Sequence, residues 1–201
     1  MTTVVKVLAI HGSPSVGGSS DTLLNAYIDS LTKSAPSNVK VEVTKVCLAQ
    51  KRFTPCKYCA SCHKSGGPCV MKDDVSDLLN TIVDSDIIVH SVPVWFYGIP
   101  GFVKGYIDRW TSLCTPSWED YRADIAEKMN GKVMAALAVC GDTCYKEMCA
   151  SAINTFKMIA AYRADRTKWA GGVSATCCDM ESGIKGAEKL GKDSLDLFLK
   201  K

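Results

Sequence analysis

The chain has 201 residues, of which 47% are hydrophobic and 22% charged, values that suit one well-filled globular domain. A formal net charge of +3 without a Lys/Arg-rich cluster excludes the charge distribution expected of a protein that binds nucleic acid. The sequence has no apolar run long enough to cross a membrane and no secretory signal pattern at its beginning, so we expect a cytoplasmic protein. In a reducing cell its 11 cysteines would stay thiols unless a metal binds them.

Strand and helix patterns alternate along the first half of the chain. Residues 4–10 form an almost continuous apolar run, typical of a strand that is buried on both faces. Apolar residues at helical spacing predict a helix over residues 23–31. The period of two in residues 38–46 predicts a strand at the sheet edge. A helix is then predicted over residues 75–83, followed by a buried strand over residues 87–92.

The second half continues the same alternation. The patterns predict a helix from residue 100 to residue 110, a strand over residues 132–139 and a helix over residues 145–161. A strand over residues 168–173 and a closing helix over residues 184–199 complete the series.

This regular alternation predicts an α/β fold with a doubly wound parallel sheet, right-handed crossovers and helices on both faces. We expect one domain over residues 1–201, because no repeat or low-complexity linker divides the chain. In such a sheet, ligands bind beyond the carboxyl ends of the strands, where the topology changes direction.

The loop after the first strand, HGSPSVGGSSDT, is a candidate phosphate site. It lacks the glycine patterns of dinucleotide and nucleoside-triphosphate loops. Hydroxyls, closely approachable glycine amides and the start of a helix together favour a phosphate monoester. The residues with these properties are Ser13, Ser15, Gly18, Ser19, Ser20 and Thr22. The alternative is an ordinary Ser/Gly connection that caps a helix.

The loop after the third strand contains three consecutive aromatic residues, Trp95, Phe96 and Tyr97. Three neighbours cannot all face the core, so at least one is available to a flat ligand or to a partner subunit. Core filling or a subunit contact without a ligand is the alternative.

Four cysteines lie close together in a loop at about residues 53–72, namely Cys56, Cys59, Cys62 and Cys69. The first three recur at intervals of three residues, a spacing that lets thiolates converge on one iron–sulfur cluster. Structural zinc is the nearest competitor, although zinc ribbons usually use two separated pairs of cysteines. Inert thiols are the third alternative. Elsewhere, the neighbours Asp108 and Arg109 at the end of a predicted helix suggest a structural ion pair.

Three segments carry a family resemblance: GSPSVGGSS, PVWFYGIPGFVKGYIDR and CKYCASCHKSGGPCVMKDD. They resemble the NADPH-dependent FMN reductase superfamily and, more narrowly, the iron–sulfur flavoproteins of anaerobic organisms. The resemblance implies a flavodoxin-like fold with a five-stranded sheet of order 2-1-3-4-5, bound FMN and a [4Fe–4S] cluster. The chain departs from the family at Ser15, where an arginine is usual, and at Ser19 and Ser20, where Asn-Thr is usual.

The resemblance also implies a role for each matching residue. Those that would bind the FMN phosphate are Ser13, Ser15, Gly18, Ser19, Ser20 and Thr22. Those that would line the ribityl chain and the isoalloxazine ring are Pro93, Val94, Trp95, Phe96, Tyr97 and Gly98. The turn that would close over the flavin from the other side consists of Cys140, Gly141 and Asp142. The cluster ligands would be Cys56, Cys59, Cys62 and Cys69.

The function implied is that of a flavin-dependent oxidoreductase that transfers electrons through FMN and a cluster. The donor would be ferredoxin or NAD(P)H, and the acceptor a small molecule such as oxygen, peroxide, a quinone or a nitroaromatic compound. The resemblance further implies a homodimer or homotetramer. Two alternatives remain open: an NAD(P)H-dependent FMN or quinone reductase without a cluster, and a flavodoxin-like binding module stiffened by zinc. No residue constellation indicates a catalytic side chain.

Overall fold

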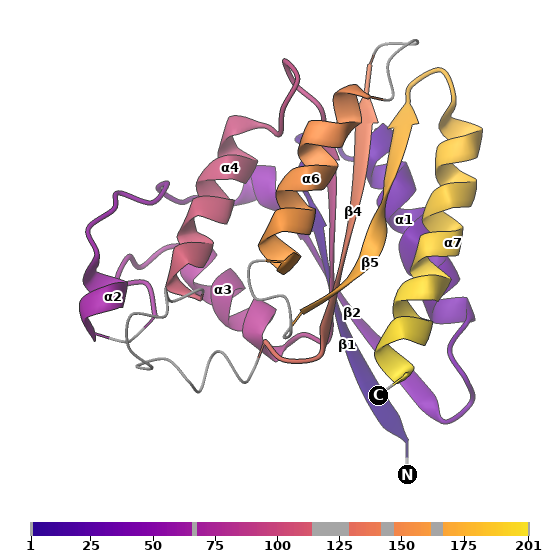
Figure 1. Cartoon of the computed structure of the whole chain (residues 1–201), viewed down its shortest axis with the longest axis horizontal. Helices are drawn as coiled ribbons and strands as arrows, with labels where there is room; N and C mark the ends of the chain where they lie inside the picture. Colours follow the sequence, from indigo (N-terminus) through magenta and orange to yellow (C-terminus); the bar gives the residue numbers. More distant parts are fainter. Residues whose placement is uncertain (1, 66–67, 114–128, 142–146, 162–166, 201) are drawn as a thin grey trace.

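A computed structural model of the chain describes residues 2–65, 68–113, 129–141, 147–161 and 167–200. Its centre is a parallel sheet of five strands in the order β2-β1-β3-β4-β5 (Figure 1). The strands are β1 (Thr3–His11), β2 (Val39–Cys47), β3 (Ile87–Pro93), β4 (Lys132–Cys140) and β5 (Thr167–Thr176). The predicted α/β class, the parallel pairing and the strand order are confirmed.

Helices cover both faces of the sheet (Figure 1). One face carries α1 (Ser19–Lys33) and α7 (Met180–Leu199), and the other carries α3 (Asp74–Asp84), α4 (Gly101–Asp108) and α6 (Met148–Ala161). A short helix, α2 (Ser61–Ser65), lies outside both layers, at the left of the view. Two 3₁₀ turns, η1 (Leu48–Gln50) and η2 (Arg109–Ser112), complete the described elements.

Alternate residues of the central strands supply two separate cores. On β1, Val7 and Ala9 pack toward α1 and α7, whereas Leu8 and Ile10 pack toward α3, α4 and α6. This division follows from the period of two along a strand, because successive side chains point to opposite faces. The edge strand β2 is less buried, and Val43 on it is 37% exposed. The predicted edge position of this strand is therefore confirmed.

The predicted helix boundaries differ from the structure at a few ends. Helix α7 begins at Met180 instead of residue 184, because the side chain of Asp179 caps it and accepts a hydrogen bond from the Ser182 amide at 3.3 Å. Helix α4 ends at Asp108, and the chain continues to Ser112 as a 3₁₀ turn. The sequence did not predict the 3₁₀ turn η1 or the short helix α2, since both are too short to show a helical period.

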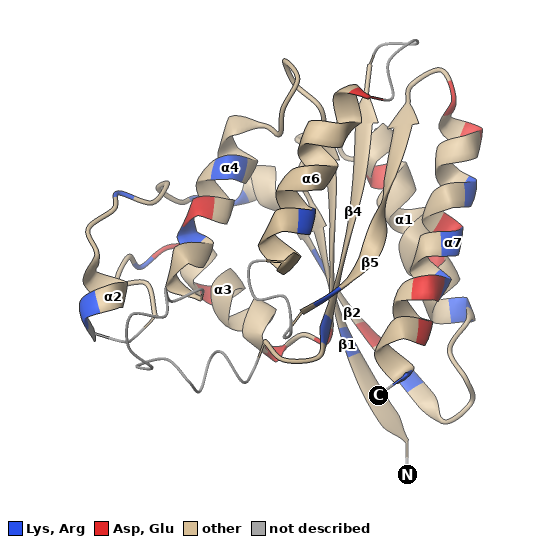
Figure 2. Ribbon diagram, viewed as in Figure 1, with Lys and Arg blue, Asp and Glu red and all other residues tan. Residues whose placement is uncertain are grey.

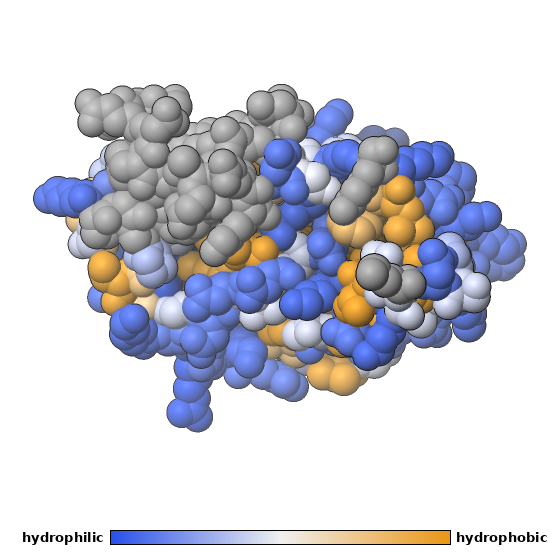
Figure 3. Space-filling view, turned by 90° about the horizontal axis from the view of Figure 1, so that it is seen from below, coloured by the Kyte–Doolittle hydropathy of each residue, from blue (hydrophilic) through white to orange (hydrophobic). Residues whose placement is uncertain are grey.

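Charges of both signs are intermixed on the described surface (Figure 2). On α7, Lys185 lies 2.7 Å from Glu181 and Lys189 lies 2.5 Å from Asp193, both as exposed pairs one turn apart. The end of the molecule where the strands begin is mostly hydrophilic where it is drawn in colour, with small apolar spots between (Figure 3). None of the described helices is long and apolar enough to cross a membrane.

Candidate cofactor sites

The loop after β1 is fixed to the neighbouring strand by two hydrogen bonds. The Gly12 amide donates to the Ser91 carbonyl at 2.8 Å, and the Ser91 hydroxyl donates to the Ser20 carbonyl at 2.6 Å. The first bond joins the end of β1 to the carboxyl end of β3, and the second joins the start of α1 to the same strand end. The predicted phosphate loop therefore lies next to the loop after β3, at the edge where parallel α/β sheets bind ligands.

The hydroxyls of the phosphate loop have different surroundings. Ser13 is buried, and its Oγ accepts a hydrogen bond from the Ser15 amide at 3.2 Å. Ser19 is partly exposed, with its Oγ 3.8 Å from the sulfur of Cys177 at the end of β5. Thr22 is exposed and donates to the Gly18 carbonyl at 3.1 Å, one helical turn earlier. The structure brings these predicted residues into one loop, whose exposed part includes Ser15.

A buried carboxylate, Asp21, also belongs to this loop. Its Oδ2 accepts a hydrogen bond from the Gly17 amide at 2.9 Å, and its Oδ1 lies 2.5 Å from the Lys45 ammonium. Burial alone would raise the pKa of Asp21, but the hydrogen bonds from Lys45 and Gly17 hold that pKa below its ordinary value. Asp21 is therefore charged and holds the predicted phosphate loop together, and Lys45 neutralises that charge.

Sequence reasoning missed this ion pair. Asp21 resembled an ordinary acidic residue of the first helical turn, and Lys45 one of the polar residues of an alternating edge strand. Only the parallel pairing of β1 with β2 brings the two side chains together, since residues 11 and 47 are partners in the register. The sequence carries no signal for that contact.

The aromatic residues after β3 form a tight turn. The amide and carbonyl of Trp95 are hydrogen-bonded to the carbonyl and amide of Gly98, at 2.9 and 3.1 Å. Between them, Phe96 has a φ of 46° and Tyr97 a φ of 67°. Positive φ at both central positions is typical of type I′ turns, which usually have glycine or asparagine there. Two bulky residues in this conformation represent backbone strain.

All three aromatic side chains of this turn are accessible, as predicted for at least one of them. Trp95 is 46% exposed, Phe96 98% and Tyr97 66%. The Trp95 ring lies edge-on to Phe102 of α4, with 6.0 Å between the ring centroids. By contrast, Val94 at the start of the loop is buried against the core. The strain thus holds aromatic rings outside the core, at the ligand-binding edge of the sheet.

The third predicted segment, the turn after β4, is only partly described. The Cys140 side chain is 1% exposed, and its thiol donates to the Ala175 carbonyl at 3.7 Å. The Cys140 carbonyl accepts from the Cys177 amide at 3.0 Å. Gly141 is exposed, and Asp142 lies outside the described residues. The Cys140 thiol therefore faces the interior, so its contribution at the sheet edge comes through the backbone.

The four cysteines of the loop line one shallow hollow beside Arg109. Cys56 and Cys59 are exposed, and Cys62 and Cys69 are partly buried. The residues Tyr58 and Ala60, which stand between successive cysteines, have left-handed φ values of 51° and 56°. These left-handed residues bend the backbone between one thiol and the next.

The thiols of this hollow already influence one another. Burial raises the pKa of Cys62, and the nearby Cys69 and Cys56 raise it further. In contrast, hydrogen bonds from Ser61 lower the pKa of Cys59. Within the described ranges, however, no three His, Cys, Asp or Glu side chains are arranged closely enough to hold a metal ion. The four sulfurs share a hollow but do not form a closed cage.

The structure corrects the predicted pairing of Asp108 with Arg109. Asp108 is bound by Lys104, one turn earlier on α4, at 2.5 Å. Arg109 instead binds Asp73 at the start of α3, with 2.8 Å between Nη1 and Oδ2. Adjacent residues on a helix point in different directions, so Asp108 and Arg109 have separate partners. Burial would raise the pKa of Asp73, but hydrogen bonds from Arg109 and the Thr54 amide hold it below its ordinary value.

The two predicted sites lie at opposite ends of α4 (Figure 1). The aromatic turn precedes the first residue of the helix, and Trp95 contacts Phe102. The cysteine loop packs against the middle of the helix, where a Cβ added to Gly105 would lie 3.1 Å from Pro55, and against its end, where Arg109 donates to Cys69. From Gly101 to Arg109 the helical rise is about 12 Å. Within one chain, the two groups of residues therefore do not form one site.

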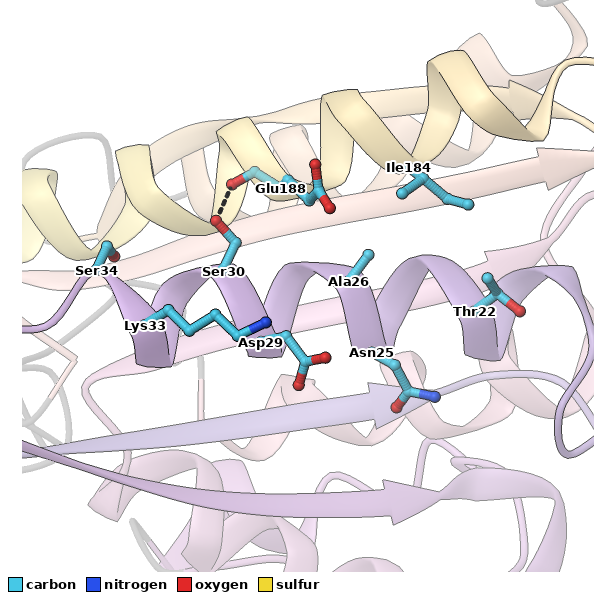
Figure 4. A pocket seen from close by; sticks show the side chains of 9 residues that line it. All are labelled: Thr22, Asn25, Ala26, Asp29, Ser30, Lys33, Ser34, Ile184 and Glu188. Carbon is cyan, nitrogen blue, oxygen red and sulfur yellow. Dashed lines mark hydrogen bonds between the residues drawn. The ribbon is translucent and has the colours of Figure 1, made fainter.

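A separate open groove runs between α1 and α7 (Figure 4). The Ser30 hydroxyl bridges it and donates to the Glu188 carbonyl at 2.7 Å. Of the predicted site residues, only Thr22 lines this groove, at the end nearest the phosphate loop. The other lining residues are mostly polar or charged, with the apolar Ala26 and Ile184 among them.

Sheet order and edge loops together define a flavodoxin-like α/β protein. The profile of the NADPH-dependent FMN reductase family matches residues 5–174, and the chain belongs to this family. Among solved structures, an azoreductase from Bacillus anthracis has a TM-score of 0.67 at 16% identity, covering 94% of this chain and 99% of that chain. At this identity the likeness establishes the fold.

Two relatives of known sequence show where the similarity lies. The chain is 30% identical over 105 residues to an iron–sulfur flavoprotein of Archaeoglobus fulgidus, covering 52% of this chain and 45% of that protein. It is 24% identical over 139 residues to a putative NAD(P)H-dependent FMN-containing oxidoreductase of Bacillus subtilis, covering 69% and 68%. The chain spans about half the length of this iron–sulfur flavoprotein and of a second one from Methanocaldococcus jannaschii.

Proposed function

We propose that this protein is an iron–sulfur flavoprotein that uses FMN and a [4Fe–4S] cluster to transfer electrons to small acceptors. One observation carries the proposal. Among the described residues, the non-glycine residues with positive φ are Tyr58, Ala60, Phe96 and Tyr97. Two of them lie in the cysteine loop and two in the aromatic turn. Such strain concentrates at sites that hold ligands, because the surrounding structure must maintain it.

The residues of the sheet edge are suited to FMN. The amides and hydroxyls at the start of α1 would bind its phosphate, with the positive end of the helix favouring the charge. These residues are Ser13, Ser15, Gly18, Ser19, Ser20 and Thr22. The turn from Pro93 to Gly98 would lie along the ribityl chain and the ring, with the Trp95, Phe96 and Tyr97 rings outside the core. Gly141 and the backbone of Cys140 would border the opposite side of the flavin.

The donor set of the cysteine loop is suited to a cluster. Four thiols line one hollow, and left-handed residues turn the chain between Cys56, Cys59 and Cys62. Thiolates at this spacing are typical ligands of [4Fe–4S] clusters. When bound, the two cofactors would supply the redox chemistry that couples one-electron donors to two-electron acceptors. The chain itself would supply the position of each cofactor and the hydrogen bonds around it.

As donor we propose NAD(P)H or ferredoxin, and as acceptor oxygen, peroxide, a quinone or a nitroaromatic compound, in the cytoplasm. We also propose a homodimer or homotetramer. The separation of the two loops along α4 favours this assembly, because a flavin at one end of α4 and a cluster at the other could approach each other between subunits. The exposed Phe96 and Tyr97 are suited to such a contact.

A second candidate is an NAD(P)H-dependent FMN or quinone reductase without a cluster. The arrangement of the thiols favours it, because no three of the described ligand side chains form a cage. The Bacillus subtilis relative, named as an FMN-containing oxidoreductase, is compatible with the same candidate. Under this candidate the cysteines would bind zinc or nothing.

Metal, sulfide and flavin analysis of anaerobically purified protein, with its visible and EPR spectra, distinguishes the candidates. We expect four iron and four sulfide per FMN, as a [4Fe–4S] cluster requires. The Cys59→Ala variant should lose iron and sulfide but keep FMN. The matched control is Cys178→Ala, which removes an exposed thiol at the end of β5 and should keep both. Zinc without sulfide in the unaltered protein would reject the cluster.

A further inference from the structure

We propose that Arg109 is a positioning residue for the iron–sulfur site, which fixes both ends of the cysteine loop and donates a hydrogen bond to the sulfur of Cys69. This inference rests on the proposed function. The sequence patterns paired Arg109 with Asp108 instead. The contacts of the Arg109 guanidinium in the structure carry the inference.

The guanidinium of Arg109 uses all five of its N–H groups. Nε donates to the Cys69 sulfur at 3.1 Å, and Nη1 donates to the Thr54 carbonyl at 2.9 Å. A bidentate pair joins it to Asp73, with distances of 2.8 and 3.2 Å to the two carboxylate oxygens. The last N–H points to the Ser76 hydroxyl at 3.5 Å. Only arginine has enough donors in one plane for these acceptors.

These acceptors come from both ends of the loop. Thr54 lies two residues before the first cysteine, Cys69 is the fourth cysteine, and Asp73 caps α3. Arg109 itself follows α4, which packs on the protein core. The Arg109 side chain, which projects from the end of α4, thus joins the beginning and the end of the cysteine loop. This guanidinium therefore adds to the hydrogen bonds of backbone amides that hold the loop against the protein core.

Burial makes these contacts strong. The Arg109 side chain has no exposed surface, and that of Asp73 is 16% exposed. Charge-assisted hydrogen bonds with little access to water are stronger than neutral ones, and their loss leaves a buried group without a partner. Hydrogen bonds to ligand sulfurs and nearby positive charge also raise the reduction potential of a cluster. Arg109 would therefore hold the loop and also favour the reduced cluster.

The test compares Arg109→Lys with Lys104→Gln, which removes an exposed charge from the neighbouring helix α4. We expect Arg109→Lys to lower the cluster potential in an EPR-monitored redox titration and to lose iron to a chelator about tenfold faster or more. Lys104→Gln should match the unaltered protein in both measurements, and FMN should remain bound in both variants. An Arg109→Lys protein with full iron, unchanged potential and unchanged iron loss would overturn the inference.

Iron uptake and hydrogen exchange give two further tests of the role of Arg109. If Arg109→Lys folds and binds FMN but takes up no iron, the positioning role is supported, and Asp73→Asn then serves for the titration. Hydrogen exchange of the metal-free proteins tests the role independently of any cluster. Amides of residues 54–64 and 68–73 should exchange faster in Arg109→Lys than in Lys104→Gln. Equal exchange would overturn positioning, whereas an unaltered protein without iron would reject only the proposed function.

Discussion

Gly12, directly after β1, faces Val92 of β3 so closely that a Cβ on Gly12 would lie 2.7 Å from the Val92 side chain. The same Cβ would lie 3.0 Å from Val103 of α4, and both valines are fully buried. The end of β1 and the start of the phosphate loop therefore depend on the absence of a side chain at this position.

We expect Gly12→Ala to lower the free energy of unfolding by about 1–3 kcal/mol, because the crowded core cannot move aside without strain. The variant should also bind FMN more weakly, since the phosphate loop begins at this residue. Urea unfolding and flavin fluorescence titration measure the two effects. Gly101→Ala is the control, because a Cβ there meets no atom within 4 Å. Equal behaviour of the two variants would contradict the crowding argument.

The strain of the aromatic turn predicts a trade-off between stability and cofactor binding. Asparagine tolerates the left-handed conformation, so Phe96→Asn should raise the unfolding free energy of the cofactor-free protein by about 1 kcal/mol. The same change removes an aromatic ring from the proposed flavin site and should weaken FMN binding several-fold, at about 1 kcal/mol for a ring contact.

The matched control for this trade-off is Tyr58→Asn. Tyr58 has a φ of 51° and is 84% exposed, but it lies in the cysteine loop. This variant should gain similar stability without any change in FMN affinity. A loss of FMN affinity in both variants would mean that the effect does not arise at the aromatic turn.

The assignment of the phosphate loop predicts discrimination between FMN and riboflavin. Ser19→Ala removes a partly exposed hydroxyl at the first position of α1. Because a hydrogen bond to a charged group contributes about 1.5–3 kcal/mol, FMN affinity should fall at least about tenfold. Riboflavin, which lacks the phosphate, should bind as before. Ser30→Ala, in the groove between α1 and α7, should change neither affinity.

A buried histidine predicts a loss of stability in acid. His90 of β3 is fully buried, stacks on Phe156 at 4.4 Å between ring centroids and lies 3.4 Å from the Tyr106 hydroxyl. Burial lowers the pKa of His90 from 6.5 to about 3. Below pH 6.5 the unfolded chain therefore binds a proton that the folded chain does not, and stability falls as the pH falls toward 3.

The expected loss from His90 is about 2 kcal/mol between pH 6.5 and pH 5, since each pH unit corresponds to about 1.4 kcal/mol. His11, whose pKa is lowered by burial against the opposing effect of Asp21, adds to the same trend. Urea unfolding of cofactor-free protein at pH 7 and pH 5 should show a smaller difference for His90→Leu than for the unaltered chain. An equal difference in both proteins would refute this origin.

The fold followed from the sequence because its strongest signals are local periods. The apolar run of β1 reflects a strand that is buried on both faces, and the alternation of β2 reflects a strand with one exposed face. The same difference places β1 inside the sheet and β2 at its edge. Helix ends were less predictable. The start of α7 depends on the cap at Asp179, which one side-chain contact decides.

The candidate sites were predictable only as segments. Residue types indicated a phosphate loop, an aromatic loop and a thiol loop, but not the contacts that hold them. The ion pair of Asp21 with Lys45 arises from strand pairing. The bidentate ion pair of Arg109 with Asp73 joins residues that are 36 positions apart in the sequence. Such contacts carry no local pattern. The prediction that paired Arg109 with Asp108 was wrong for the same reason, since neighbours in sequence point in different directions.

The base of the cysteine loop is closed by short bonds. The Arg52 amide donates to Asp74 at 2.8 Å, and the Asp74 amide donates back to the Arg52 carbonyl at 3.3 Å. The two ends of the loop are therefore joined directly by two hydrogen bonds between Arg52 and Asp74. Phe53 and Cys69 of this loop pack against one core, so we expect changes of length between them to leave the strand register intact. A protein of this architecture could thus change its thiol loop while keeping the phosphate loop and the sheet that carries it.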